Sequence, residues 1–222
     1  MSQGKTLKNF ENYNNEIGVP LTLFQLSRQV RFAVIEMATQ KPGDMKILAR
    51  MVQPTLCVIT NIGMSHLSGL HNVETVAIEK GKLFEKTSSK GTLFINGGDR
   101  KILSMAQTLP QQKVIFSVQK IAEAQTFFVH SKSLGIKGWE AVVSAGGEEF
   151  SLTIPHIGRS MLENSLAAIA VGHHLGVSFE QIERGLAQKI FSSGRSEFIH
   201  LSEQRMLIDD TYNSNPLSMR AA

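Results

Sequence analysis

The chain has 222 residues, of which 42% are hydrophobic and 19% are charged, so it is long enough for one large domain and too apolar for a disordered protein. No apolar stretch approaches the roughly 20 residues that span a bilayer, and no secretion signal opens the chain, so no membrane association is expected. The single cysteine, Cys57, favours a reducing cytoplasm. The net charge of +4 suggests anionic ligands, but no basic run typical of nucleic-acid binding is present.

Short apolar runs rich in Val, Ile and Phe alternate with helical patterns in the first half of the chain. The runs predict buried strands at Arg31–Met37, Thr55–Ile62, Thr92–Asn96 and Lys113–Ser117. The patterns between them predict helices at Pro20–Gln29, Gly43–Val52, Asn72–Thr87 and Arg100–Thr108. This alternation is typical of an α/β fold with a mostly parallel sheet flanked by helices.

The pattern changes after Val118, where apolar segments become closely spaced and are separated by glycine turns. They predict a small antiparallel addition to the sheet, with strands at Thr126–His130, Gly138–Ser144 and Glu149–Ile154. Two helices, Ser160–Leu175 and Ser178–Gln188, and a last strand, Arg205–Asp209, follow. Residues 1–15 are polar and predict no strand. Because both ends look cut, we expect the chain to be a piece of a larger protein.

Polar side chains end three of the predicted strands. Glu36, Asn61 and Asn96 stand at these ends, and His66 follows Asn61 on a glycine-containing loop. Each residue alone is more often a loop cap. Because ligands bind outside the carboxyl ends of parallel strands, the three together indicate a ligand site.

Lys80 interrupts the apolar face of the helix predicted at Asn72–Thr87. It is either a lysine whose apolar stem lies on that face with its amine in solvent, or a functional lysine facing the sheet edge. Since a buried ammonium is costly, carbamylation by carbon dioxide would turn it into a carboxylate-like metal ligand. Glu36, His66 and carbamylated Lys80 would then supply ligands for Mg²⁺, although His66 alone could simply cap its loop.

Gly4-Lys5-Thr6 has the ending of a phosphate-binding loop but not its context. The motif needs a glycine four residues before the Gly-Lys pair, a preceding strand and a following helix. These are missing, so we do not expect residues 4–6 to be a working phosphate-binding loop.

Several motifs occur in one order along nearly the whole chain. They include Asn12-Tyr13-Asn14-Asn15, Glu36-Met37-Ala38, Asn61-Ile62-Gly63 with His66, Ala77-Ile78-Glu79-Lys80-Gly81, Gly158-Arg159 with Asn164, Gly194-Arg195, and Asp209-Asp210-Thr211-Tyr212-Asn213. In these motifs the sequence resembles the Mur ligase family, in the branch that adds D-alanyl-D-alanine.

This resemblance implies a three-domain enzyme with a P-loop NTPase-like central domain. Residues 1–202 would be that ATP-binding domain without its phosphate loop, and residues 203–222 the hinge and first strand of the C-terminal domain. Gly4-Lys5-Thr6 would be a connecting loop that leads into the segment at Asn12. The implied reaction uses ATP and Mg²⁺ to join UDP-N-acetylmuramoyl-tripeptide to D-alanyl-D-alanine through an acyl phosphate, in peptidoglycan biosynthesis. The 222 residues alone would be inactive.

The resemblance also implies roles for single residues. Glu36 corresponds to a ligand of the ATP-bound magnesium, and His66 with carbamylated Lys80 to the second magnesium site. The residues that correspond to nucleotide contacts are Asn96, Asn164, Arg195 and Asp210. Those that correspond to the segment facing substrate and phosphates are Asn12, Asn14 and Asn15.

The chain departs from the family pattern at three places. Residues 38–41 replace Gly-Ala-Asn-His, Ser160 replaces a histidine, and Lys82 stands where glutamate is common. Two alternatives therefore stay open. One is a sister amide ligase, such as another Mur ligase or a folylpolyglutamate synthase-like enzyme, and the other is a non-catalytic module of the same fold.

Overall fold

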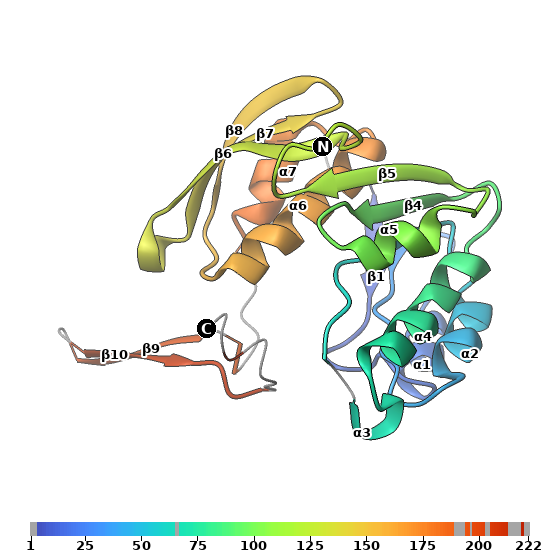
Figure 1. Ribbon diagram of the computed structural model, residues 1–222. Helices are drawn as coiled ribbons and strands as arrows, with labels where there is room; N and C mark the ends of the chain where they lie inside the picture. Colours follow the sequence, from blue (N-terminus) through green and yellow to red (C-terminus); the bar gives the residue numbers. More distant parts are fainter. Residues whose placement is uncertain are drawn as a thin grey trace. The chain divides into compact units, whose positions relative to one another are not determined.

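The computed structural model describes residues 4–64, 67–188, 194–195, 197–202, 205–212 and 219 (Figure 1). The chain forms two compact units, Met1–Phe116 and Ser117–Ala222. None of the helices in the described ranges is long and apolar enough to cross a membrane.

Parallel strands and the helices between them build the first unit. β1 (Lys5–Lys8) pairs with β2 (Val30–Val34), and β4 (Thr92–Asn96) lies between β3 (Leu56–Ile59) and β5 (Gln112–Ser117), all in parallel. The helices of this unit are α1 (Gly18–Leu23), α2 (Asp44–Val52), α3 (Leu67–Leu70), α4 (Val73–Lys86) and α5 (Arg100–Ala106). The predicted mostly parallel arrangement with helices between the strands is confirmed, but β2 pairs with β1 in a sheet of its own and not with β3, β4 or β5.

The apolar core of this unit lies between β3, β4 and three helices. It contains Cys57 of β3, Leu93 of β4, Met45 of α2, Phe84 of α4 and Ile102 of α5. Both faces of a parallel sheet are normally covered, which explains why β4 is a continuous apolar run rather than an alternating one.

The second unit contains an antiparallel sheet and two helices. β6 (Thr126–Ser133), β7 (Trp139–Ala145) and β8 (Glu148–Ile154) pair in that order, with a short 3-10 turn, η1 (Gly135–Lys137), between β6 and β7. α6 (Arg159–His174) and α7 (Phe179–Leu186) follow, and the Phe150 ring on β8 stacks on the Phe179 ring with centroids 4.0 Å apart. β9 (Glu197–Ser202) and β10 (Arg205–Asp209) form a separate antiparallel pair. The predicted antiparallel addition is confirmed, but β9 was not predicted.

The N-terminal segment differs from the expectation. Residues 1–15 were expected to hold no strand, yet Lys5–Lys8 form β1 by pairing with β2. Lys5 and Thr6 are therefore strand residues, and the prediction of a connecting loop at residues 4–6 is also wrong. The pattern failed here because three of the four strand residues are exposed and leave no apolar signal.

Two predicted strands end earlier than expected. β2 ends at Val34 and β3 at Ile59, so Glu36 and Asn61 each stand two residues beyond their strands. Asn96 is the last residue of β4, as predicted.

The thiol of Cys57 gives a test of the core. Burial raises its pKa to about 12, although a hydrogen bond with Thr87 acts in the opposite direction. At pH 8 the reactive thiolate is therefore scarce, and we expect no measurable reaction of the folded protein with a disulfide reagent. In concentrated urea the same reagent should modify one thiol per chain, since the sequence holds one cysteine. Rapid modification without urea would show that β3 is not sealed in the core.

Candidate active site at the carboxyl ends of the strands

The loop that follows β3 is held by side chains from β4 and from the start of α5. Asn96 donates from Nδ2 to the carbonyl oxygen of Thr60 at 2.7 Å, and its Oδ1 accepts the amide N–H of Gly98 at 2.9 Å. Asp99 accepts the amide N–H of Ile62 at 2.8 Å through Oδ2. Asp99 also caps α5, because its Oδ1 accepts the amide N–H groups of the first helical turn. Sequence reasoning assigned Asp99 no role, although its position before a helical pattern was a signal.

Lys80 reaches the same loop from α4. Its Nζ donates to the carbonyl oxygen of Asn61 at 3.1 Å, as expected for a lysine that faces the carboxyl ends of the strands. The side chain is half-buried, on a helix whose Val76 and Phe84 are fully buried. Burial lowers the pKa of the Lys80 ammonium, and the negative charge of Asp99 acts against that lowering. The neutral amine is therefore easier to form here than on a solvent-exposed lysine.

A second set of contacts surrounds Glu36. Asn14 donates from Nδ2 to Oε1 of Glu36 at 3.0 Å. The buried Asn9 accepts the Glu36 amide N–H at 2.7 Å and donates to the Glu36 carbonyl oxygen at 3.2 Å. The Glu36 side chain is exposed, and within the described ranges its Oε2 has no hydrogen-bond donor. The backbone of Glu36 is thus fixed while one carboxylate oxygen stays available.

The other asparagines of the N-terminal segment differ in their contacts. Asn15 accepts the amide N–H groups of Ile17 and Gly18 at 3.1 and 2.9 Å through Oδ1, so it shapes the start of α1. Asn12 is exposed. Among the residues that the structure describes, Asn14 is the one of the three asparagines predicted to face substrate that touches another predicted site residue.

The remaining predicted site residues lie in the second unit or outside the described residues. Asn164 is exposed on α6. The Arg195 guanidinium lies 4.4 Å from the centroid of the Tyr212 ring, and Asp210 is exposed after β10. His66 lies outside the described residues, so its predicted part in a metal site stays a prediction.

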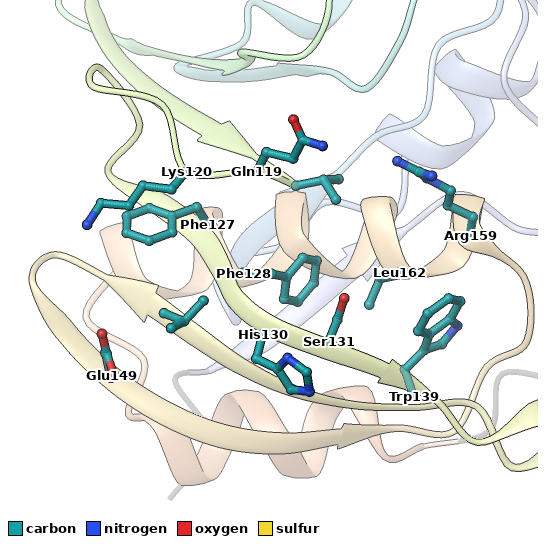
Figure 2. A pocket seen from close by; sticks show the side chains of 12 residues that line it. Gln119, Lys120, Phe127, Phe128, His130, Ser131, Trp139, Glu149, Arg159 and Leu162 are labelled. Atoms are coloured by element: carbon teal, nitrogen blue, oxygen red, sulfur yellow. The ribbon is translucent and has the colours of Figure 1, made fainter.

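A hollow of about 550 Å³ in the second unit contains none of the predicted site residues. Figure 2 shows Phe127 and Lys120 at one end, and Arg159 and Leu162 of α6 at the other. Lys120 Nζ lies 5.5 Å from the centroid of the Phe127 ring. The lining of the hollow combines apolar rings with the cations Lys120 and Arg159, and the sequence analysis predicted no site there, although Arg159 belongs to the Gly158-Arg159 motif.

The donor set of the first unit suits a cation that prefers oxygen. Mg²⁺ binds one or two carboxylates and keeps waters and phosphate oxygens as further ligands. The available oxygen of Glu36 meets that requirement, and the Lys80 amine would meet it once converted to a carbamate. Within the described ranges, no cluster of three or more His, Cys, Asp or Glu side chains offers a complete protein shell. A sparse site completed by phosphates is the arrangement that fits these residues.

Comparison with known proteins identifies the family. Residues 1–172 match the model of the Mur ligase middle domain. The chain belongs to the Mur ligase family. It is 31% identical over 219 residues to the UDP-N-acetylmuramoyl-tripeptide--D-alanyl-D-alanine ligase of Buchnera aphidicola from Acyrthosiphon pisum, covering 99% of this chain and 48% of that protein. The chain thus spans about half the length of the relatives it matches.

Solved Mur ligase structures agree with this assignment. A crystal structure of MurF from Acinetobacter baumannii matches with a TM-score of 0.90 and 28% identity, covering 99% of this chain and 47% of that one. The MurF ligase of Thermotoga maritima, solved in complex with ADP, matches with a TM-score of 0.83 over 99% of this chain and 50% of that one. At 21% identity, this second likeness shows the fold alone.

Removal of the Asp99 carboxylate should loosen the loop after β3. Asp99→Ala leaves the Ile62 amide without its acceptor and α5 without its cap, so we expect a loss of about 1–2 kcal/mol in the free energy of unfolding. Asp99→Asn keeps one acceptor oxygen, which can serve either the Ile62 amide or the first turn of α5 but not both, so it should lose less stability than alanine. Urea denaturation followed by circular dichroism measures both variants. Equal stability of Asp99→Ala and the unchanged protein would refute the capping role.

Proposed function

We propose that the full-length protein is an ATP-dependent ligase that forms an amide bond between UDP-N-acetylmuramoyl-tripeptide and D-alanyl-D-alanine. The observation that carries the proposal is the similarity to a ligase of that name along 99% of the chain. It is supported by the placement of Lys80, on an otherwise apolar helix face, against the loop after β3. We assign residues 1–202 to the central ATP-binding domain, residues 203–222 to the start of the C-terminal domain, and the enzyme to the cytoplasm.

The proposed reaction has two steps, formation of an acyl phosphate and then formation of the amide. A substrate carboxylate oxygen attacks the γ-phosphorus of ATP, and the bond to the β–γ bridging oxygen breaks to release ADP. The amine of D-alanyl-D-alanine then attacks the acyl carbon of the acyl phosphate, an amide bond forms, the amine loses a proton and inorganic phosphate leaves. Such reactions depend on positioning and on neutralisation of phosphate charge.

Glu36, His66 and Lys80 are the residues that we propose to hold Mg²⁺. When bound, the metal supplies positive charge that offsets the charge of the phosphate oxygens. Asn14 orients the Glu36 carboxylate by donating to Oε1, which leaves Oε2 as the oxygen for the metal. We further propose that Asn12 and Asn15 contact substrate or phosphate, and that Asn96, Asn164, Arg195 and Asp210 contact the nucleotide.

Carbamylation of Lys80 would make it an anionic ligand. The neutral ε-amine adds to carbon dioxide, a C–N bond forms, and one proton leaves to give a carbamate. Burial lowers the Lys80 pKa and so favours the neutral form that this addition requires. One N–H remains on the carbamate nitrogen, and it can keep the hydrogen bond to the Asn61 carbonyl.

The proposed activity is tested with the purified full-length protein. Incubation with ATP, Mg²⁺, UDP-N-acetylmuramoyl-tripeptide and D-alanyl-D-alanine should release one ADP for each new amide product, measured by liquid chromatography and mass spectrometry. D-alanine, L-glutamate and L-lysine serve as control amines and should give little product. Product from a single amino acid instead of the dipeptide would favour a sister ligase. No product with any amine would favour the non-catalytic module.

Substitution of Lys80 distinguishes a carbamylated, anionic Lys80 from a Lys80 that acts as a cation. Lys80→Ala should lower turnover by on the order of 10²–10³ or more, because a charge-stabilising group is lost, and added short carboxylic acids should restore part of it. Lys80→Arg is the matched control, since it keeps a cation that can donate to Asn61 but cannot become a carbamate. It should be as damaging as alanine.

A spectroscopic measurement detects the Lys80 carbamate directly and complements the activity assays of the variants. Labelled bicarbonate should give a ¹³C carbamate signal in the unchanged protein that is absent from both Lys80 variants. Near-normal activity of Lys80→Arg would show that the residue acts as a cation toward phosphate, and the carbamate would then be rejected.

A further inference from the structure

We propose that Glu79 is a positioning residue that holds Lys80 in a fixed place relative to Glu36, by tying α4 to the end of the segment that leads away from Glu36. This inference rests on the proposed function, since it concerns the two residues assigned there to Mg²⁺. It starts from a buried carboxylate, Glu79, to which neither the proposed reaction nor the sequence analysis assigned a role.

Glu79 is 1% exposed, and both of its carboxylate oxygens are used. Its Oε1 accepts the amide N–H groups of Gly43 and Met45, each at 2.9 Å. Its Oε2 pairs with the Lys82 ammonium one helical turn away. A carboxylate is kept this deeply buried when hydrogen bonds and a counter-charge satisfy it, so its position between α4 and α2 is closely defined.

The two amides that Glu79 binds belong to the start of α2. Gly43 is the N-cap residue of that helix and has no side chain to cap it, with φ at 101°. The first amides of a helix have no partner within the helix. Glu79 supplies that partner from α4, and Figure 1 shows α2 and α4 side by side. The hydrogen bonds therefore join two helices at one defined point.

Residues 37–43, which we call the connecting segment, link Glu36 to this point. Near its start, the Ala38 amide donates to the Asn14 carbonyl oxygen at 2.9 Å. Near its end, the amides of Gln40 and Lys41 donate to Oδ2 of Asp44 at 3.0 and 2.9 Å. The connecting segment is thus held along its length, and a shift of Gly43 would be passed back toward Glu36.

α3 packs closely against the middle of the connecting segment. A Cβ atom added to Gly69 would lie 1.9 Å from the Gln40 carbonyl oxygen, so a side chain has no room there. The segment therefore has little freedom to adjust if its anchor at Gly43 is lost.

Lys80 is the next residue after Glu79 on α4. Neighbouring helical residues point about 100° apart, so Glu79 faces α2 while Lys80 reaches the Asn61 carbonyl oxygen on the loop after β3. Any rotation of α4 that broke the Glu79 contacts would also move the Lys80 amine. The same contacts explain Lys82, which stands where glutamate is common in the family, because a lysine there neutralises Glu79.

Four variants of the full-length protein test this role. Glu79→Ala removes the contacts, and Glu79→Asp keeps the charge but withdraws it by one methylene. Lys82→Met removes the ion pair and keeps the contacts to α2. Ile102→Ala is the control for stability, since Ile102 is buried in the same core but on α5. Urea denaturation of each variant gives the loss of stability against which the other readouts are compared.

Two readouts report on the position of Lys80 and of the metal ligands. One is the rate at which an acetylating reagent modifies Lys80, measured by peptide mass spectrometry. The other is the Mg²⁺ concentration for half-maximal ligase activity. Glu79→Ala should speed acetylation and raise that Mg²⁺ concentration about tenfold, the usual effect of removing a residue that orients metal ligands. Glu79→Asp should change both in the same direction. Lys82→Met, which leaves the buried carboxylate without its counter-charge, should change both by a smaller amount in that direction, and Ile102→Ala should resemble the unchanged protein.

The outcomes distinguish this inference from the proposed function. If Glu79→Ala or Glu79→Asp behaves like Ile102→Ala in both readouts, Glu79 is only a stabilising residue and the inference is overturned. If Glu79→Ala does not fold, Glu79→Asp decides by the same comparison. If the unchanged protein forms no amide product, the proposed function fails, and the rate of Lys80 acetylation still decides whether Glu79 positions Lys80.

Discussion

Parallel strands that end at one edge of a sheet impose the constraint on which the candidate site depends. A parallel sheet is stable only when helices cover it, so each strand must be followed by a crossover that returns to the same edge. Residues distant in the sequence therefore meet there without any sequence signal of their proximity. The loop after β3 shows the result, because Asn96 from β4, Asp99 at the start of α5 and Lys80 from α4 all bind residues 60–62. These three side chains share one partner, the backbone of the loop after β3.

The sequence predicted the structure best in two situations: where a whole segment is buried, and where a charged residue stands on a buried face. The run Thr92–Asn96 was predicted at its observed bounds because nearly every side chain in it is buried. Lys80 was singled out because a charge on an apolar helix face is costly, and its contact with Asn61 bears out the expected direction. The first prediction used a continuous apolar run and the second a helical periodicity, and a single chain displays both without knowledge of a partner element.

The features that were missed have their partners in backbone groups. β1 is stabilised by pairing with β2 and is largely exposed, so its polar residues gave no strand pattern. The sequence assigned Glu79 no role of its own, because its partners are two backbone amides, which leave no mark in a pattern of side chains. The contact of Asp99 with the Ile62 amide was likewise not predictable, whereas its capping of α5 was signalled by its position before a helical pattern. Contacts to the backbone thus decide much of this site, and a sequence pattern of side chains records few of them.

Cys57 has a practical consequence for measuring how the parts of this protein move. It is the one cysteine of the chain, and it lies sealed in β3. A cysteine introduced at an exposed position would then be the only thiol that a fluorescent or spin label reaches under folding conditions. Pairs of such labels, one in each compact unit, would report distances between the units in solution with no need to remove a native residue first.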